Sequence, residues 1–225
     1  PEKTVMIKQV HLTGAQRDLY EAVRLAMHAR VRNEIRDKGF EKSYLYLLAA
    51  LTKLRQVCCD PRLVKLEMAR EVEESAKLST LMEMVLELLE EGRKIIIFSQ
   101  FTGMLDLIAD ELDFEKISYV QLRGSTKDRA TPVESFQNGD VPVFLISLKA
   151  GGTGLNLTAA DTVIHYDPWW NPASEDQATD RAHRIGQTKP VFVYKLITAG
   201  TIEERLLELQ NRKKVIADNM FDEKG

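Results

Sequence analysis

Apolar residues recur along this chain with two different periods, and the change comes near residue 92. Up to that point they repeat every three or four positions, as Leu47, Leu51 and Leu54 do, which is the spacing of helices with one buried face. Beyond it, short continuous runs such as IIIF, VFLI and TVIHY alternate with helical stretches. Runs of this length that are rich in Ile and Val are typical of strands buried on both faces of a parallel sheet.

The pattern predicts an extended segment, then helices, then strands and helices in alternation. The extended segment is 4–12. The predicted helices are 13–37, 43–57, 76–91, 102–112, 126–137, 172–185 and one that begins near Thr201. The predicted strands are 94–98, 117–122, 142–147, 161–166 and 190–197. Since Pro132 falls inside 126–137, a start near residue 131 stays open for that helix. The alternation predicts an α/β fold with a mainly parallel sheet and helices on both faces.

Several helix ends carry local signals. Thr13 with Gln16, and Thr201 with Glu204, have the spacing of a capping box, in which each side chain bonds a free backbone N–H of the other residue. Thr102 is a candidate N-cap. We expect the apolar stripe of the last helix to pack across its own domain.

Composition sets wide limits. The 44% apolar and 29% charged residues describe an ordinary globular protein. A net charge of −3 argues against bulk attraction to nucleic acid, so any DNA contact must come from a local patch. Cys58 and Cys59 lack the spacing of a zinc site, and we expect buried thiols and no metal. No apolar run approaches the roughly 18–20 residues of a membrane span, so we expect no membrane partner.

Polar residues and glycines follow three of the predicted strands. Ser99 and Gln100, with Phe101 next to them, follow the first strand. Arg123, Gly124 and Ser125 follow the second, and Ser147, Lys149, Gly151, Gly152 and Gly154 follow the third. Open α/β sheets bind ligands beyond the carboxyl ends of their strands, and successive glycine N–H groups can hold an anion. A tight turn remains the other interpretation of the glycines. A dinucleotide fingerprint is disfavoured, because Leu157 stands where its third glycine belongs.

Two arginines and an amide are spaced to share one face of the predicted helix 172–185. They are Gln177, Arg181 and Arg184, which are four and three residues apart. A fixed pair of planar cations suits the charge that spreads over a transferring phosphoryl group, although a solvated helix face is the ordinary alternative. The chain has no GxxxxGK[ST] loop and no DExH run, and it offers no convincing base or nucleophile.

Taken jointly, three segments resemble motifs V and VI of the Swi/Snf-type ATPases of the second helicase superfamily. Ser147–Leu157, Asp167–Pro172 and Gln177–Gln187 match the family patterns S-x-K-A-G-G-x-G-L-N-L, D-P-W-W-N-P and Q-A-x-x-R-x-x-R-I-G-Q. Leu54–Pro61 resembles L-R-Q-x-C-x-x-P, which in the family lies in a helical protrusion. We nevertheless interpret Arg55 within it as part of a solvated helix face.

The resemblance implies a division of the chain and a function. Residues 1–75 would be an extended segment and helical protrusion, 76–200 a RecA-like C-terminal lobe, and 201–225 a brace helix and tail. The whole enzyme would hydrolyse ATP, move along double-stranded DNA and remodel a protein bound there, inside the cell. An N-terminal RecA-like lobe of the same polypeptide, upstream of Pro1, would bring the phosphate loop and hold Mg²⁺. The chain alone is therefore expected to be inactive.

The resemblance also implies roles for individual residues. Arg181 and Arg184 would be catalytic. Gln177, Gly152 and Gly154 would line the ATP side. The residues expected to contact DNA are Ser99, Gln100, Gly124, Ser125, Ser147, Lys149 and Gly151. Arg129 comes earlier than in the family, and its role stays open. The runner-up function is a non-catalytic RecA-like interaction module, with a stand-alone nucleotide sensor as a weaker third.

Overall fold

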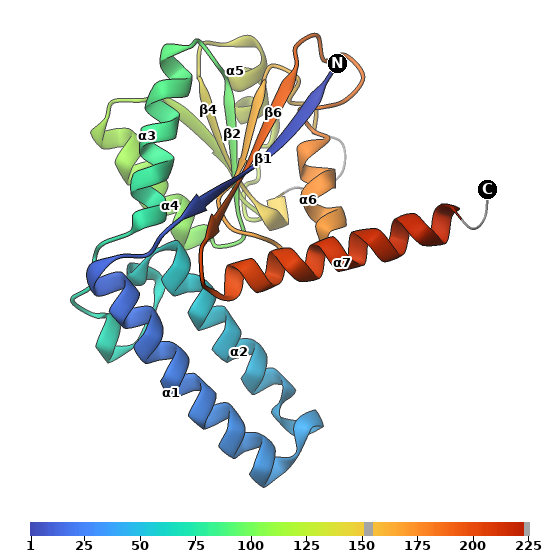
Figure 1. Cartoon of the computed structure of the whole chain (residues 1–225). Coiled ribbons are helices and arrows are strands. Elements are labelled where there is room, and N and C mark those ends of the chain that lie inside the picture. The colour runs from blue at the N-terminus through green and yellow to red at the C-terminus, as the bar shows by residue number, and fades with distance from the viewer. Residues whose placement is uncertain (151–154, 223–225) are drawn as a thin grey trace.

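Six parallel strands form one sheet in a computed structural model that describes residues 1–150 and 155–222. The strands are β1 (Lys3–Val10), β2 (Ile95–Ser99), β3 (Tyr119–Leu122), β4 (Val143–Ser147), β5 (Thr162–His165) and β6 (Val191–Thr198). Their order across the sheet is β1-β6-β5-β2-β4-β3, and every neighbouring pair runs parallel. The five predicted strands are present, and the predicted α/β class with a parallel sheet is confirmed (Figure 1).

Helices cover both faces of this sheet. They are α1 (Gly14–Lys38), α2 (Phe40–Cys59), α3 (Ala76–Glu90), α4 (Thr102–Phe114), α5 (Ala130–Asn138), α6 (Pro172–Thr179) and α7 (Ile202–Asp222), with short 3₁₀ turns η1 (Pro61–Leu63), η2 (Glu67–Ala69) and η3 (Leu148–Ala150). Because side chains alternate along a strand, Ile95 and Ile97 pack with α3 and α4, while Ile96 and Phe98 face the core of α5 and α6. Among the described residues, no helix is both long enough and apolar enough to cross a membrane.

The extended N-terminal segment is part of the sheet, which the sequence pattern did not predict. β1 pairs with β6 over its whole length, from Lys3 beside Val191 to Val10 beside Thr198. The helices α1 and α2 then leave the carboxyl edge of the sheet as a hairpin with a small core of its own (Figure 1). The helical protrusion therefore begins after β1, and the first ten residues belong structurally with the lobe.

Two predicted caps are wrong. The side chain of Thr13 makes no capping bond. Gln16 is buried instead, where its amide donates to Val57 O at 2.9 Å and accepts from Ala76 N–H at 2.9 Å. Gln16 thus joins α1 to α2 and α3. A buried amide group needs hydrogen-bond partners, and it finds them in these two neighbouring helices. Thr102 begins α4 but does not cap it.

The last helix packs on the lobe only through its first turns. Thr201 Oγ1 accepts from the N–H of Glu203 at 3.2 Å, and it is Glu203, not Glu204, whose carboxylate turns inward. Leu206 is buried, whereas Leu209, Ile216 and Met220 are exposed. Beyond the first turns α7 extends away from the sheet (Figure 1). The prediction that the whole stripe packs across its own domain is therefore wrong for the second half of the helix.

Candidate nucleotide and DNA interface

The three polar strand ends meet at one edge of the sheet. β2, β4 and β3 are neighbours, and Ser99 is the register partner of Ser147. Beyond them, a Cβ placed on Gly124 would lie 3.5 Å from the Cβ of Lys149. Lys149 and Ser125 are exposed there. The structure thus brings residues from two predicted strand ends together at a surface that a ligand can reach.

Other predicted contact residues lie inside the edge rather than on it. Ser99 is fully buried and its Oγ donates to Asp167 Oδ1 at 2.6 Å. Ser147 is also buried, and its Oγ accepts from Ala150 N–H at 3.3 Å. The last residues of these central strands are inaccessible to solvent. Their hydroxyl groups therefore bond residues of the loops that follow and hold those loops in place. Gln100 is half-buried. The predicted residues Gly151, Gly152 and Gly154 lie outside the described residues.

Arg129 borders the segment that follows β4. It lies just before α5, and its Nη1 donates to Ala150 O at 3.3 Å. The arginine therefore holds the last described residue before the glycine run. This geometry gives Arg129 a structural contact with the candidate site.

The helix that was expected to carry both arginines is shorter than predicted. α6 ends at Thr179, and bonds to the third residue back follow it, from Arg181 N to Ala178 O and from Ala182 N to Thr179 O. Gln177 is exposed on α6, while Arg181 and Arg184 lie in the turns after it, so the three do not share a helix face. We call residues 180–187 the arginine turn.

The arginine turn is fastened to residues 155–160, which follow the glycine run. Leu157 N–H donates to Arg181 O at 2.9 Å, and Arg184 Nη1 donates to Leu155 O at 3.0 Å. Gln187 is buried, and its Nε2 lies within 3.0 Å of three carbonyl oxygens, those of Thr158, Ala160 and Ala182. Motifs V and VI therefore form one braced unit, with its position set by backbone as well as side-chain bonds.

The two guanidinium groups of the turn are close enough to affect each other. Arg181 is 5% exposed, and Arg184 is exposed. Burial, and then the positive charge of Arg184, lower the pKa of Arg181. Two cations held near each other make a site where an anion is stabilised, because it offsets their mutual repulsion.

The start of α6 is tied to the C-terminal helix. Asn171 caps it through Oδ1, which accepts from Ala173 N–H at 3.1 Å, and Pro172 occupies the first helical position as predicted. The buried carboxylate of Glu175 accepts from Trp169 N–H at 3.0 Å and from Gln210 Nε2 of α7 at 3.1 Å. The arginine turn and α7 are thus connected through α6.

Arg55 is the residue that sequence reasoning misplaced most clearly. It was expected on a solvated helix face, but it is 5% exposed. Its Nη2 donates to Gln100 Oε1 and, at 3.3 Å, to Pro168 O. Its charge also lies over two rings, 5.4 Å from the centroid of Phe101 and 5.7 Å from that of Trp170. The match to L-R-Q-x-C-x-x-P was the one signal that favoured a specific role.

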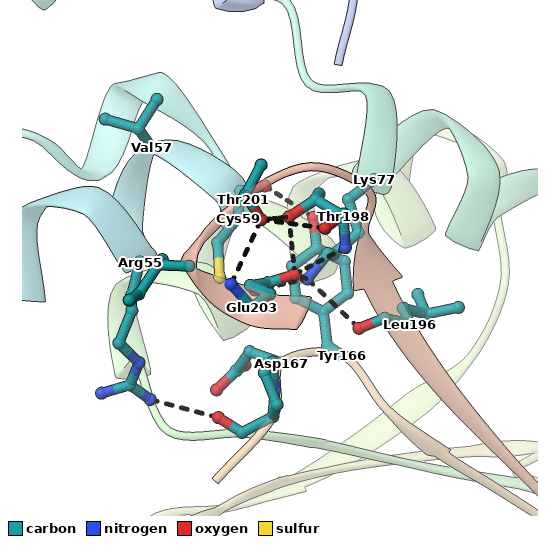
Figure 2. A network of polar contacts seen from close by, with 12 residues as sticks. Arg55, Val57, Cys59, Lys77, Tyr166, Asp167, Leu196, Thr198, Thr201 and Glu203 are labelled. Carbon is teal, nitrogen blue, oxygen red and sulfur yellow. Dashed lines mark hydrogen bonds and ion pairs between the residues drawn. The ribbon is translucent and has the colours of Figure 1, made fainter. Parts of the chain in front are cut away.

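A buried polar network lies beneath this edge, and sequence reasoning did not predict it (Figure 2). Lys77 Nζ bonds both carboxylate oxygens of Glu203, at 2.5 and 2.7 Å, and Tyr166 OH donates to Cys59 O at 2.7 Å. Burial raises the pKa of Asp167 to about 6. The network joins the end of α2, the start of α3 and the β6–α7 corner.

No metal centre is found where the structure describes the chain, since no group of three His, Cys, Asp or Glu side chains there is arranged to hold an ion. Cys58 and Cys59 are both buried free thiols, as predicted. The guanidinium, ammonium and amide groups at the sheet edge and in the arginine turn are suited to binding anions.

Comparison with known proteins agrees with this geometry. Residues 76–186 match the helicase conserved C-terminal domain. An uncharacterized ATP-dependent helicase of Mycoplasma pneumoniae is 42% identical over 207 residues, which cover 88% of this chain and 20% of that protein. The chain thus spans about a fifth of the length of that relative.

Two solved structures from Sulfolobus solfataricus are similar to the chain in both fold and sequence. The C-terminal domain of its SWI2/SNF2 ATPase has a TM-score of 0.75 at 32% identity, covering 95% of this chain and 87% of that one. The SWI2/SNF2 ATPase core in complex with double-stranded DNA has a TM-score of 0.79 at 38% identity, covering 96% and 45%. The chain therefore belongs to the Swi/Snf family of the second helicase superfamily and is its C-terminal RecA-like lobe.

Proposed function

We propose that this chain is the second motor lobe of an ATP-dependent translocase that moves on double-stranded DNA. It supplies arginine fingers to an ATP site and contacts the DNA backbone with the carboxyl edge of its sheet. The observation that carries the proposal is the arginine turn, in which Arg181 and Arg184 lie close together and are braced by residues 155–160.

The chemistry of the arginines follows from phosphoryl transfer. Charge spreads over the equatorial oxygens of the transferred group in the transition state, and planar cations held in place stabilise it without reorganising. Arg184 is exposed and can approach a nucleotide, while Arg181 is held behind it by burial. Gln177, exposed on α6, and the glycines Gly152 and Gly154 would line the same nucleotide. An interaction module has no need of such a braced pair.

The rest of the ATP site would come from the N-terminal RecA-like lobe of the same polypeptide. ATP and Mg²⁺ are the cofactors of the complete motor, and Mg²⁺ would be held by that other lobe. The relatives and solved structures named above include an ATP-dependent helicase and an ATPase core bound to duplex DNA, which supports this assignment. A DNA-bound protein would be the remodelled target, inside the cell.

The DNA surface of the proposal is the exposed part of the carboxyl edge. Lys149, Ser125 and Gly124 lie together there, with Gln100 half-buried nearby and Gly151 next in the chain. Ser99 and Ser147 support this surface from below. Most of these groups are uncharged, so they would bond phosphate oxygens without reading sequence and would release few counterions.

Duplex titration at several salt concentrations tests the proposed DNA surface. We expect weak binding without sequence preference and a slope of log K against log salt of roughly −1 to −2, because each neutralised phosphate contributes about −0.9. Lys149→Ala should make the slope shallower by about one unit and weaken all sequences equally. Fluorescence anisotropy of labelled duplexes measures both quantities.

Lys189→Ala is the matched control, because Lys189 is exposed just before β6, at the opposite edge of the sheet. It should leave the slope unchanged. A steep wild-type slope, or full affinity in Lys149→Ala, would place the DNA surface elsewhere, most plainly on α1 with Arg30, Arg32 and Arg36.

A further inference from the structure

Arg55 extends from the hairpin of α1 and α2 to the carboxyl edge of the sheet. Arg55, in the last turns of α2, bonds Gln100 after β2 and Pro168 after β5, which are 45 and 113 residues away in sequence. Figure 2 shows it directed at the segment that contains Asp167. One guanidinium group therefore connects three parts of the chain.

The surroundings of Arg55 suit a guanidinium and no other cation. Nη2 donates to two oxygens, and the guanidinium carbon lies over the rings of Phe101 and Trp170. A guanidinium can bond in its plane and stack on its faces at the same time, whereas an ammonium group has no planar face to stack.

Gln100 is held from both ends of its amide. Its Oε1 accepts from Arg55 and its Nε2 donates to Pro168 O at 3.3 Å, while its backbone N–H donates to Asp167 Oδ2 at 3.2 Å. A half-buried glutamine on a loop end would otherwise sample several rotamers, and binding a phosphate would then have to order it. Because Arg55 holds the Gln100 amide in one orientation, the entropic cost of ordering this side chain is already met before a phosphate binds.

We propose that Arg55 is a positioning residue for DNA binding, acting through Gln100. This inference rests on the proposed function, because it takes Gln100 as a DNA contact. Arg55 itself is 5% exposed and lies behind the surface. The α1–α2 hairpin is thereby connected to the DNA-binding edge of the sheet, so a displacement of α2 changes the orientation of Gln100.

The first test reports on the position of the edge without DNA. Replacing buried Trp169 by Phe leaves Trp170, whose ring centroid is 5.7 Å from the guanidinium carbon of Arg55 and which is 37% exposed, as the only tryptophan of the chain. In that background Arg55→Lys should increase acrylamide quenching of Trp170, because the guanidinium over the ring is lost. Arg62→Lys, which changes an arginine paired with Asp60 just after α2, should leave the quenching unchanged. Unchanged quenching in Arg55→Lys would overturn the proposal.

The second test asks whether Arg55 acts through Gln100. We expect Arg55→Lys to weaken duplex binding by about tenfold, which corresponds to one well-formed hydrogen bond. In a Gln100→Ala background the same change should have little further effect, because the group that Arg55 positions is gone. Melting temperatures check that each variant is folded, and Arg55→Met is a second replacement if the lysine disrupts packing.

The outcomes separate this inference from the proposed function. Additive losses in the double variant would show that Arg55 does not act through Gln100. Tenfold weakening in Arg62→Lys would show that replacing any arginine near the end of α2 weakens binding. Either result overturns the inference. If the wild-type lobe binds no duplex at all, the proposed DNA surface fails, and with it the role given to Arg55, even where the quenching result shows that Arg55 orders the edge.

Discussion

At the scale of single residues, burial decides what the polar groups of this lobe can do. Ser99 and Asp167 lie at the carboxyl edge of the sheet but bond each other at 2.6 Å instead of facing solvent. Arg55 lies deep and orders Gln100, whereas Arg184 and Lys149 keep their charges at the surface. Some charged side chains of the site can therefore contact a ligand, whereas the buried ones hold the contacting residues in position.

Asp167 should make the stability of the lobe depend on pH between about 4 and 6. Burial raises its folded-state pKa to about 6, while its pKa in the unfolded chain is about 3.9. In that range the native state holds a proton that the unfolded state has lost, so stability falls as pH rises. The contribution present below about pH 4 is lost above about pH 6, a change of about 3 kcal/mol.

Asp167→Asn removes this titration and isolates it from all other groups. The difference in free energy of unfolding between wild type and variant, measured by urea denaturation from pH 4 to pH 8, should shift in favour of the variant as pH rises. A difference that does not change with pH would mean that Asp167 titrates normally in the folded lobe.

At the scale of elements, one buried ion pair holds the helices together beneath the sheet edge. Lys77 of α3 and Glu203 of α7 are both essentially inaccessible to solvent, and Glu203 also accepts from Thr198 N–H and Thr198 Oγ1, both at 2.9 Å. Burial by itself would lower the pKa of Lys77, but the Glu203 carboxylate outweighs it and the pKa is raised. The lysine is therefore charged in the folded lobe.

Removing one partner of this pair should be costly and removing both much less so. Lys77→Met leaves a buried carboxylate without its cation, and we expect a loss of about 3–5 kcal/mol. Lys77→Met with Glu203→Gln keeps an oxygen for Thr198 and should recover more than half of that loss. Arg24→Met, at the half-exposed pair Arg24–Glu21, is the control and should cost under about 1 kcal/mol. Additive losses at the buried pair would contradict its description as a coupled unit.

Local patterns were enough to predict most of these elements, and most of the failures come from contacts between distant segments. Apolar runs predicted five strands and the α/β class, because central strands are apolar throughout. β1 was not assigned to the sheet, because pairing with β6 is a contact between distant segments. The same reason explains Gln16 and Arg55, whose side chains have partners far along the chain. The end of α6 was missed for a local reason. Gln177, Arg181 and Arg184 keep the spacing of a helix in the sequence, although the helix ends at Thr179 and the backbone continues in turns.

At the scale of the whole molecule, the lobe has features that call for a partner. The hairpin of α1 and α2 and the exposed half of α7 extend from the sheet (Figure 1). α7 connects to α6 through the hydrogen bond from Gln210 Nε2 to Glu175. The arginine turn follows α6 directly. A second lobe that moved α7 would therefore also move α6 and, with it, the arginine turn. In the proposed function these arginines complete an ATP site.

Steady-state kinetics of Arg184→Ala in the complete motor tests this role of the arginines. Its hydrogen bond to Leu155 O contributes about 1 kcal/mol, so the variant should fold. An arginine that acts on charge present only in the transition state should lower kcat by about 10³-fold or more and leave the affinity for ATP nearly unchanged. Arg70→Ala, at an exposed surface pair with Glu67, is the matched control and should keep wild-type turnover. An unchanged kcat in Arg184→Ala would show that Arg184 is an ordinary surface arginine without a role in ATP hydrolysis.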